Sequence, residues 1–389
     1  MNNTFTQTPF AKPLYIMAKP LGSRCNLACD YCYYLGTTPA RDGLMSDELL
    51  ELFISSYIKS QPSPNVSFVW HGGEPLLAGI PFFKKVLKLQ HKYGRGYQID
   101  NSLQTNGVLL NEDWCRFFHE NNFLIGISLD GPEIVHDHYR RTRNGKGSFA
   151  LAMHGVELLI KHQVEFNILS VIDNHGAEYA SETYRFLKST GSRFIQFSPI
   201  VERNLKTMEL TPQTITPEQF GNFYNTIFDE WKRADIGSVF VRMFDDTLAG
   251  YMGVEKGLCT YCETCGHAGV IERDGSVYAC DHFVFPEYKL GNLHTQTLTE
   301  MMLSQKQLHF GNDKKAGLPA QCRQCPFLAL CNGGCPKDRI SETKQGEPNL
   351  NYLCAGLRSY FSHTRKDMEY MANELRNQRS PMNLMNLYK

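Results

Sequence analysis

The sequence has no surplus of charge of either sign, no long hydrophobic run and no low-complexity tract. Its 40 lysines and arginines balance 40 aspartates and glutamates, which excludes a net field that would draw nucleic acid or an anionic membrane to the whole surface. The first 20 residues lack the charged and apolar segments of a secretory signal. We therefore expect a cytoplasmic protein with no nucleic-acid or membrane partner.

Cysteine, by contrast, is abundant and unevenly distributed. Of the 13 cysteines, three lie between Cys25 and Cys32, nine lie between Cys259 and Cys354, and Cys115 stands alone. Disulfides are rare in a reducing compartment, and thiols that only fill a core would be scattered along the chain. The clustering therefore predicts metal sites at two places in the sequence.

Short β-rich runs alternate with amphipathic helical segments in the first half of the chain. We expect strands over residues 14–19, 66–70, 97–104, 124–129, 165–172 and 193–197. The helices expected between them cover residues 46–59, 81–93, 111–121, 148–162 and 177–189, with Ser46 and Asn111 as N-caps. Strict alternation implies parallel strands with crossover helices. A partial barrel and a doubly wound sheet both fit this alternation.

The second half of the chain changes character. Helices are expected over residues 216–234 and, less regularly, 239–252, after which cysteines, glycines and hairpin segments such as 269–278 dominate. A region with so few periodically spaced apolar residues has little hydrophobic core of its own. It therefore needs cross-links, which metal clusters would supply. We expect a barrel over 1–235, a helical connection over 236–257, a cysteine-rich domain over 258–360, and a C-terminal helix and tail over 361–389.

The first cysteine group directly follows the first expected strand. Cys25, Cys29 and Cys32 have the spacing C-x3-C-x2-C, and three thiolates fill only three of the four iron sites of a 4Fe-4S cubane. The remaining iron is then open to chelate a ligand and to transfer an electron to it. A structural zinc site is the alternative, but it requires four ligands and the loop contains no histidine.

This loop resembles the signature of the radical S-adenosylmethionine (SAM) enzymes, and Trp70-His-Gly-Gly-Glu-Pro75 is similar to the GGEP motif of that family. The resemblance implies a partial (β/α)6 barrel in which the open iron binds SAM and reduces it to a 5'-deoxyadenosyl radical. It also implies contacts to SAM from Tyr31, Gly73, Glu74, Gln104, Ser128, Arg140 and the backbone near Val201. Plain turns, and a solvated basic run at residues 140–143, explain several of these positions equally well.

The second cysteine group holds enough thiols for two more cubanes. It comprises Cys259, Cys262, Cys265, Cys280, Cys322, Cys325, Cys331, Cys335 and Cys354. Eight of these would complete two four-thiolate clusters, which leaves Cys115 as a core thiol and one cysteine of the 259–265 run unassigned. Zinc knuckles are the alternative, because thiolate spacing does not by itself select the metal.

The same pattern is similar to the SPASM extension of radical SAM enzymes, which binds two auxiliary 4Fe-4S clusters. The resemblance therefore implies three 4Fe-4S clusters and SAM as cofactors. It assigns one auxiliary cluster to Cys259, Cys265, Cys280 and Cys335, and the other to Cys322, Cys325, Cys331 and Cys354. Cys262 has no counterpart in the pattern and is a competing ligand for the first of these clusters.

Within this group the chain resembles the anaerobic sulfatase-maturating enzymes, in motifs that include Asp274-Gly-Ser-Val-Tyr-Ala-Cys-Asp281 and Cys331-Asn-Gly-Gly-Cys335. The resemblance implies oxidation of a Cys or Ser side chain, in an unfolded or nascent sulfatase, to Cα-formylglycine. The radical would abstract a β-hydrogen, Asp281 would be the base, an auxiliary cluster would accept an electron, and flavodoxin or ferredoxin would supply reductant. An ordinary carboxylate is a weak base toward a thiol, so partial burial that raised the pKa of Asp281 would help it in this role. The alternatives for Asp281 are a structural aspartate at the exit of the hairpin or a hydrogen-bond partner of the cluster thiolates.

Two other functions fit parts of the pattern. One is a SPASM-type maturase that crosslinks a ribosomal peptide; many such enzymes carry an N-terminal peptide-recognition domain, for which the 24 residues before Cys25 are too few. The other is a zinc-stabilised barrel that acts as a binding module. Iron content separates this module from the enzymes, because three cubanes hold about twelve iron atoms per chain.

Overall fold

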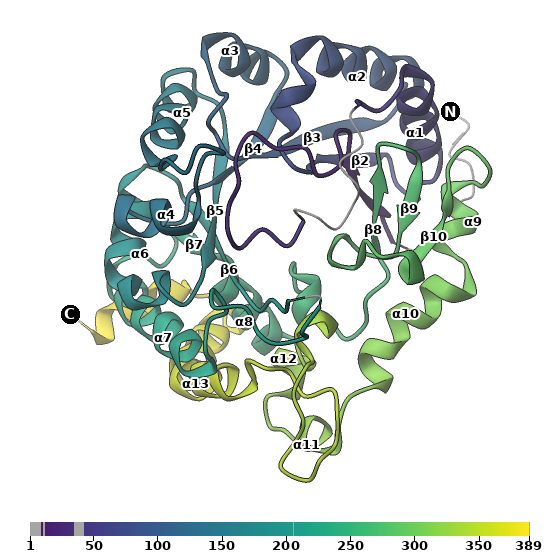
Figure 1. Ribbon diagram of the computed structural model, residues 1–389. Helices are drawn as coiled ribbons and strands as arrows, with labels where there is room; N and C mark the ends of the chain where they lie inside the picture. Colours follow the sequence, from purple (N-terminus) through teal and green to yellow (C-terminus); the bar gives the residue numbers. More distant parts are fainter. Residues whose placement is uncertain (1–8, 11, 35–42, 205, 389) are drawn as a thin grey trace.

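The computed structural model describes residues 9–10, 12–34, 43–204 and 206–388, and its centre is one sheet in the order β10-β9-β8-β1-β2-β3-β4-β5-β6-β7. Strands β1 to β7 are parallel to one another. Their bounds are Tyr15–Lys19, Asn65–Trp70, Gln98–Thr105, Phe123–Ser128, Phe166–Ile172, Phe194–Pro199 and Phe240–Val241. Figure 1 shows the sheet curving around an interior, with the crossover helices between the parallel strands on its outer side.

The strand order decides between the two architectures that the alternation left open. From β1 to β7 each strand pairs with the next one in the sequence, without the reversal that defines a doubly wound sheet. The other edge of β1 is occupied by β8, so the sheet is a partial barrel and not a closed ring. The six expected strands are confirmed to within two residues, whereas the two-residue β7 lies in a segment that we expected to be helical.

The helices α1 to α8 connect these strands. Their bounds are Asp47–Lys59, Ile80–Tyr93, Glu112–Glu120, Glu133–Tyr139, Phe149–Lys161, Ala180–Ser189, Pro217–Ala234 and Arg242–Met252. The expected N-caps are confirmed, because Ser46 Oγ accepts from Leu49 N at 3.2 Å and Asn111 Oδ1 accepts from Trp114 N at 2.9 Å. The short α4 was not expected. Among the described residues, no helix combines the length and the apolar character needed to cross a bilayer.

The cysteine-rich region joins the barrel through its sheet. Strand β8 (Ala268–Glu272) runs parallel to β1 along its whole length and places Glu272 opposite Lys19. The antiparallel strands β9 (Ser276–Tyr278) and β10 (Lys289–Asn292) follow. The turn of the β8–β9 hairpin lies at Asp274-Gly275, as the sequence predicted. This pairing fixes the cysteine-rich region against the mouth of the barrel.

Further helices complete the chain. They are α9 (Leu298–Met302), α10 (Gln305–Ala316), α11 (Ala320–Arg323), α12 (Leu328–Cys331) and α13 (Cys354–Arg376). Helix α13 packs along α7, and the tail that follows it forms the 3-10 helix η7 (Pro381–Leu387), in which Leu384 is buried. The expected C-terminal helix is confirmed, and the described part of the tail packs against it.

A close approach of α13 to α7 gives a stability prediction. A Cβ added at Gly356 would lie 2.0 Å from the carbonyl oxygen of Pro217. We expect Gly356→Ala to lower the free energy of unfolding by about 1–3 kcal/mol, as overpacking does, although alanine is intrinsically favoured over glycine in a helix by about 1 kcal/mol. Anaerobic thermal unfolding measures the change. Lys366→Ala, at an exposed position of the same helix, is the control, and a stabilised Gly356→Ala would contradict the packing argument.

Candidate active site

The loop of residues 21–34, here called the cysteine loop, follows β1 and crosses the interior of the barrel (purple in Figure 1). The segment after α4 holds one side of it. Leu27 forms an antiparallel bridge with Thr142, and Ala28 N donates to the carbonyl of Arg141 at 2.8 Å. Arg143 donates to the carbonyl of Cys25 at 2.6 Å. The three cysteines of the loop are therefore presented on a fixed backbone.

The surroundings of these cysteines suit iron ligands. Cys25 Sγ accepts from the backbone N of Leu27 at 3.4 Å and from Asn106 Nδ2 at 3.7 Å. Burial raises the pKa of Cys29 to about 12, and it also raises the pKa of Cys25. A buried thiolate therefore needs positive charge beside it, and a coordinated metal supplies that charge because it deprotonates the thiol outright.

The GGEP segment locks the cysteine loop to the next strands. Gly73 N donates to the carbonyl of Gly22 at 2.8 Å, and a Cβ at Gly73 would lie 2.0 Å from the carbonyl of Arg24, so only glycine fits there. The Glu74 carboxylate is fully buried and accepts from Thr105 Oγ1 at 2.8 Å and from Asn106 N at 2.9 Å. Burial raises the pKa of Glu74 to about 7. Glu74 thus joins the ends of β2 and β3.

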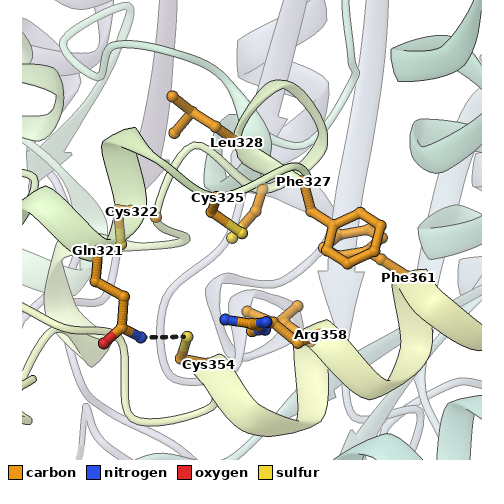
Figure 2. Close-up of a pocket in the computed structure, with 11 residues that line it drawn as sticks. Gln321, Cys322, Cys325, Phe327, Leu328, Cys354, Arg358 and Phe361 are labelled. Atoms are coloured by element: carbon orange, nitrogen blue, oxygen red, sulfur yellow. Dashed lines mark hydrogen bonds between the residues drawn. The ribbon is translucent and has the colours of Figure 1, made fainter. Parts of the chain in front are cut away.

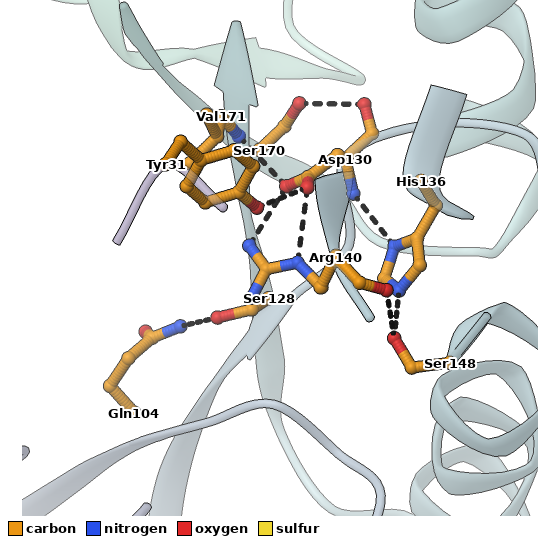
Figure 3. A network of polar contacts seen from close by, with 9 residues as sticks. All are labelled: Tyr31, Gln104, Ser128, Asp130, His136, Arg140, Ser148, Ser170 and Val171. Atoms are coloured by element: carbon orange, nitrogen blue, oxygen red, sulfur yellow. Dashed lines mark hydrogen bonds and ion pairs between the residues drawn. The ribbon is translucent and has the colours of Figure 1, made fainter. Parts of the chain in front are cut away.

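Several predicted SAM contacts lie in one polar network, shown in Figure 3. Arg140 forms a two-pronged ion pair with Asp130 at 3.0 and 2.9 Å, and Tyr31 Oη donates to the same carboxylate at 2.5 Å. Beside them Gln104 Nε2 donates to Ser128 Oγ at 2.9 Å. Arg140 is 7% exposed, so its interpretation as part of a solvated basic run is wrong.

Asp130 organises this network, and the sequence did not single it out. Burial alone would raise the pKa of Asp130, but Arg140 holds that pKa below its usual range. Its carboxylate also accepts from the backbone N of Val171 at 3.0 Å, so it joins β4 to β5. The sequence did contain a signal for this ion pair. In Ser128-Leu-Asp-Gly131 an acidic residue follows an expected strand, and an arginine comes ten residues later.

The backbone of Val201, the last predicted SAM contact, contacts the cysteine-rich region. Its carbonyl accepts from Lys337 Nζ at 2.8 Å, and the same ammonium pairs with Glu202 at 2.7 Å. Lys337 belongs to the cysteine-rich region, in the 3-10 helix η6 (Pro336–Asp338). The contact fixes the backbone after β6 against that region.

Asp281 directly follows Cys280 and faces the cysteine loop. Tyr33 Oη donates to Asp281 Oδ2 at 2.9 Å. Burial would raise the pKa of Asp281, but His282 and Lys19 beside it hold that pKa below its usual range. Burial does not raise the pKa of Asp281, because the neighbouring positive charge outweighs the effect of burial.

Lys19, Tyr33 and Tyr34 complete the surroundings of Asp281, and none of them was predicted. Lys19 is 1% exposed, and its Nζ finds no hydrogen-bond partner among the described residues. It lies 3.7 Å from the centre of the Tyr34 ring, within cation–π range. Burial lowers the pKa of His71 to about 4, so His71 is neutral at pH 7.

Cys259, Cys265, Cys280 and Cys335, here called the first auxiliary set, are within electrostatic range of one another. Burial raises the pKa of Cys280, and charge on Asp281, Cys335 and Cys259 raises it further. Burial, Asp338, Cys259 and Cys265 likewise raise the pKa of Cys335. Cys262 also influences Cys259 and Cys265, but its thiol is directed at the backbone carbonyls of Leu258 and Lys256, at 3.6 and 3.7 Å.

The second auxiliary set lines a pocket of its own. Cys322, Cys325, Cys331 and Cys354 share its wall with apolar side chains that include Phe327, Leu357 and Phe361. Figure 2 shows the labelled sulfur atoms around this common space, and Gln321 Nε2 donates to Cys354 Sγ at 3.9 Å.

Cys115, the expected core thiol, is fully buried on α3.

The arrangement of the thiols bears on the zinc alternative. Among the residues that the structure describes, no three histidine, cysteine or acidic side chains converge on a point that suits one metal ion. The donors themselves are three thiols in the cysteine loop and four thiols around the pocket of the second auxiliary set. Thiol sets of this kind fit 4Fe-4S cubanes, whose irons are held by cysteine thiolates at their corners.

Comparison with known proteins places this site in a family. The sequence profile of the Radical SAM superfamily matches residues 20–187, and that of an iron–sulfur cluster-binding domain, SPASM, matches residues 259–326. A serine-type anaerobic sulfatase-maturating enzyme of Bacteroides thetaiotaomicron is 51% identical, over 99% of this chain and 97% of the relative. A cysteine-type enzyme of Clostridium novyi is 35% identical, over 94% and 98%.

A solved structure shares the whole architecture. That of anSMEcpe, with bound AdoMet and the Cp18Cys peptide, superimposes with a TM-score of 0.86 at 33% identity, and the match covers 93% of this chain and 99% of that one. The two sequence profiles lie on the barrel and on the cysteine-rich region, in the order that the structure shows. This chain therefore belongs to the family of anaerobic sulfatase-maturating enzymes, within the radical SAM superfamily.

Proposed function

We propose that this protein oxidises a serine or cysteine side chain of an unfolded or nascent sulfatase to Cα-formylglycine. The observation that carries the proposal is the position of Asp281, which is bonded to Cys280 and joined by Tyr33 to the cysteine loop. A proton acceptor thus lies between two sites for iron–sulfur clusters. The relatives named for serine-type and cysteine-type sulfatase maturation support the substrate class.

As a radical SAM enzyme with a SPASM domain, the protein uses SAM and 4Fe-4S clusters. When bound, these cofactors supply a radical that removes a hydrogen atom from the β-carbon of the substrate, and they provide an acceptor for one electron. The chain supplies the proton acceptor, because the neighbours of Asp281 keep its carboxylate ionised. A radical centre on the adjacent carbon makes the hydroxyl or thiol proton more acidic, which reduces the basicity that Asp281 needs.

The proposed SAM site lies at the carboxyl ends of β1 to β6. We assign it to Tyr31, Gly73, Glu74, Gln104, Ser128, Arg140 and the backbone at Val201. In this proposal Glu74 acts through the backbone of the GGEP segment. Its carboxylate accepts hydrogen bonds from Thr105 and Asn106, which fix the shape of that segment. The network of Asp130 orients Tyr31 and Arg140.

The cluster ligands are proposed as predicted: Cys25, Cys29 and Cys32 hold the SAM-binding cluster, and the two auxiliary sets hold one cluster each. Flavodoxin or ferredoxin is the proposed electron donor. The domain bounds 1–235, 236–257, 258–360 and 361–389 also remain a proposal, and their outermost residues, 1–8 and 389, lie outside the described part of the chain. Helix α13 crosses the last of these bounds.

Mass spectrometry of a sulfatase-motif peptide tests the function. The anaerobically reconstituted enzyme, with SAM and reductant, is incubated with a serine peptide and with its cysteine counterpart. We expect an aldehyde at the target residue, detected by reaction with a hydrazide probe. We also expect faster turnover of the serine peptide, since two serine-type relatives are 51% and 41% identical. A product that has lost two hydrogens but does not react with the probe would identify a crosslinking maturase instead.

Asp281→Asn separates radical formation from substrate oxidation. We expect the variant to keep SAM cleavage and to lose formylglycine formation by about 10²–10⁴-fold, the usual contribution of a general base. The two products, 5'-deoxyadenosine and peptide aldehyde, are quantified in one reaction. Asp274→Asn, in the β8–β9 turn, is the matched control. Normal aldehyde yield from Asp281→Asn would exclude Asp281 as the base.

A pair of cysteine variants tests the ligand assignment. Wild-type protein should hold about twelve iron atoms per chain, as three cubanes require. Cys262→Ala should retain them, because its thiol is directed at backbone carbonyls, whereas Cys265→Ala should lose iron from one cluster only. Iron analysis and electron paramagnetic resonance (EPR) of the purified variants measure this. Iron loss in Cys262→Ala but not in Cys265→Ala would reverse the assignment.

A further inference from the structure

Two buried cations lie among the auxiliary cysteines. Lys314 on α10 and Arg339 after η6 are 1% and 9% exposed. Arg339 donates to the carbonyls of Gly333 at 3.0 Å, Lys314 at 2.5 Å and Asn332 at 2.8 Å. Lys314 Nζ donates to the carbonyls of Cys259 at 2.6 Å and Thr260 at 2.9 Å. Both cations are thus solvated by backbone carbonyls.

Both cations are held by the backbone of the cysteine segments. Lys314 Nζ donates to the carbonyl of Cys259, which belongs to the first auxiliary set. Arg339 donates to the carbonyls of residues 332–334, which join Cys331 of the second set to Cys335 of the first. Arg339 therefore lies between the two sets and Lys314 beside the first. The sulfur atoms that influence each cation come from the same sets.

The backbone of the motif Cys331-Asn-Gly-Gly-Cys335 binds the guanidinium of Arg339. Asn332, Gly333 and Gly334 have φ angles of 48°, 72° and 64°, so three successive residues adopt the left-handed conformation. Their carbonyls accept from the guanidinium, and a Cβ at Gly333 would lie 2.8 Å from Arg339 Nη2. The segment that joins a cysteine of the second set to one of the first thus wraps a positive charge.

Buried charges require a partner of opposite sign, since burial without one is costly. A 4Fe-4S cubane with four thiolates carries net negative charge, and reduction adds to that charge. We propose that Arg339 is the shared counterion of the two auxiliary clusters, that Lys314 is a counterion of the first alone, and that both raise the reduction potentials of the clusters they face. This inference rests on the ligand sets of the proposed function.

The electron balance gives these counterions a role in the reaction. Conversion of a serine CH2OH group to an aldehyde releases a hydrogen atom, a proton and an electron. The radical that bound SAM supplies would take the hydrogen atom, Asp281 would take the proton, and an auxiliary cluster would accept the electron. A cation between the clusters favours this last step, because it stabilises the reduced state of either cluster.

EPR-monitored redox titration of the reconstituted enzyme tests the proposal. In Arg339→Gln we expect the midpoint potentials of both auxiliary clusters to shift to more negative values, with that of the SAM-binding cluster unchanged. In Lys314→Met only one auxiliary cluster should shift. Arg339→Lys keeps the charge and should stay near wild type. Lys366→Gln, at an exposed position of α13, is the control.

The outcomes are distinct. Unchanged auxiliary potentials in an Arg339→Gln protein of full iron content would overturn the proposal. If that variant does not assemble its clusters, Lys314→Met decides, and auxiliary potentials equal to wild type in it would overturn the proposal equally. A wild-type protein that holds iron for fewer than three clusters would instead contradict the ligand sets of the proposed function.

Discussion

The site depends on how the three-cysteine loop is fastened to one edge of a curved parallel sheet. All loops after parallel strands meet at that edge, and the neighbouring loops take hold of this one: Gly73 closes on Arg24, and Leu27 pairs with Thr142. In the proposed function the loop would contribute three thiolates, so a cubane held on it would keep one iron open. Rigid support would then keep these three ligands in place while the open iron exchanges its own.

A second constraint is the continuity of the sheet between the two halves of the molecule. The pairing of β8 with β1 places Glu272 opposite Lys19, and the hairpin then delivers Cys280 and Asp281 to the cysteine loop. Positive charge recurs where buried sulfur or carboxylate must be neutralised: Lys19 beside Asp281, Arg140 on Asp130, and Arg339 among the auxiliary cysteines. The fold thus supplies both the position and the charge of each reactive group.

The sequence predicted the regular elements well, because local patterns determine them. The six strands and the helices between them follow from the spacing of hydrophobic residues. The N-caps at Ser46 and Asn111 follow from polar residues at the helix starts. It could not decide between a barrel and a doubly wound sheet, nor find the β1–β8 pairing, because strand partners distant in sequence leave no local pattern. Lys19 and Arg339 escaped notice for the same reason, since only the folded chain shows that they are buried. The lowered pKa of Asp281 likewise depends on neighbours from other elements.

The central claim is that the cysteine loop holds a cluster with one iron open to SAM. EPR of the anaerobically reduced protein, recorded with and without SAM, tests it most directly. We predict that SAM changes the signal of the cluster on Cys25, Cys29 and Cys32, and that isotopic labelling of the SAM carboxylate or amino group produces a hyperfine coupling to it. A signal that SAM leaves unaltered, in protein with its full iron content, would contradict the account.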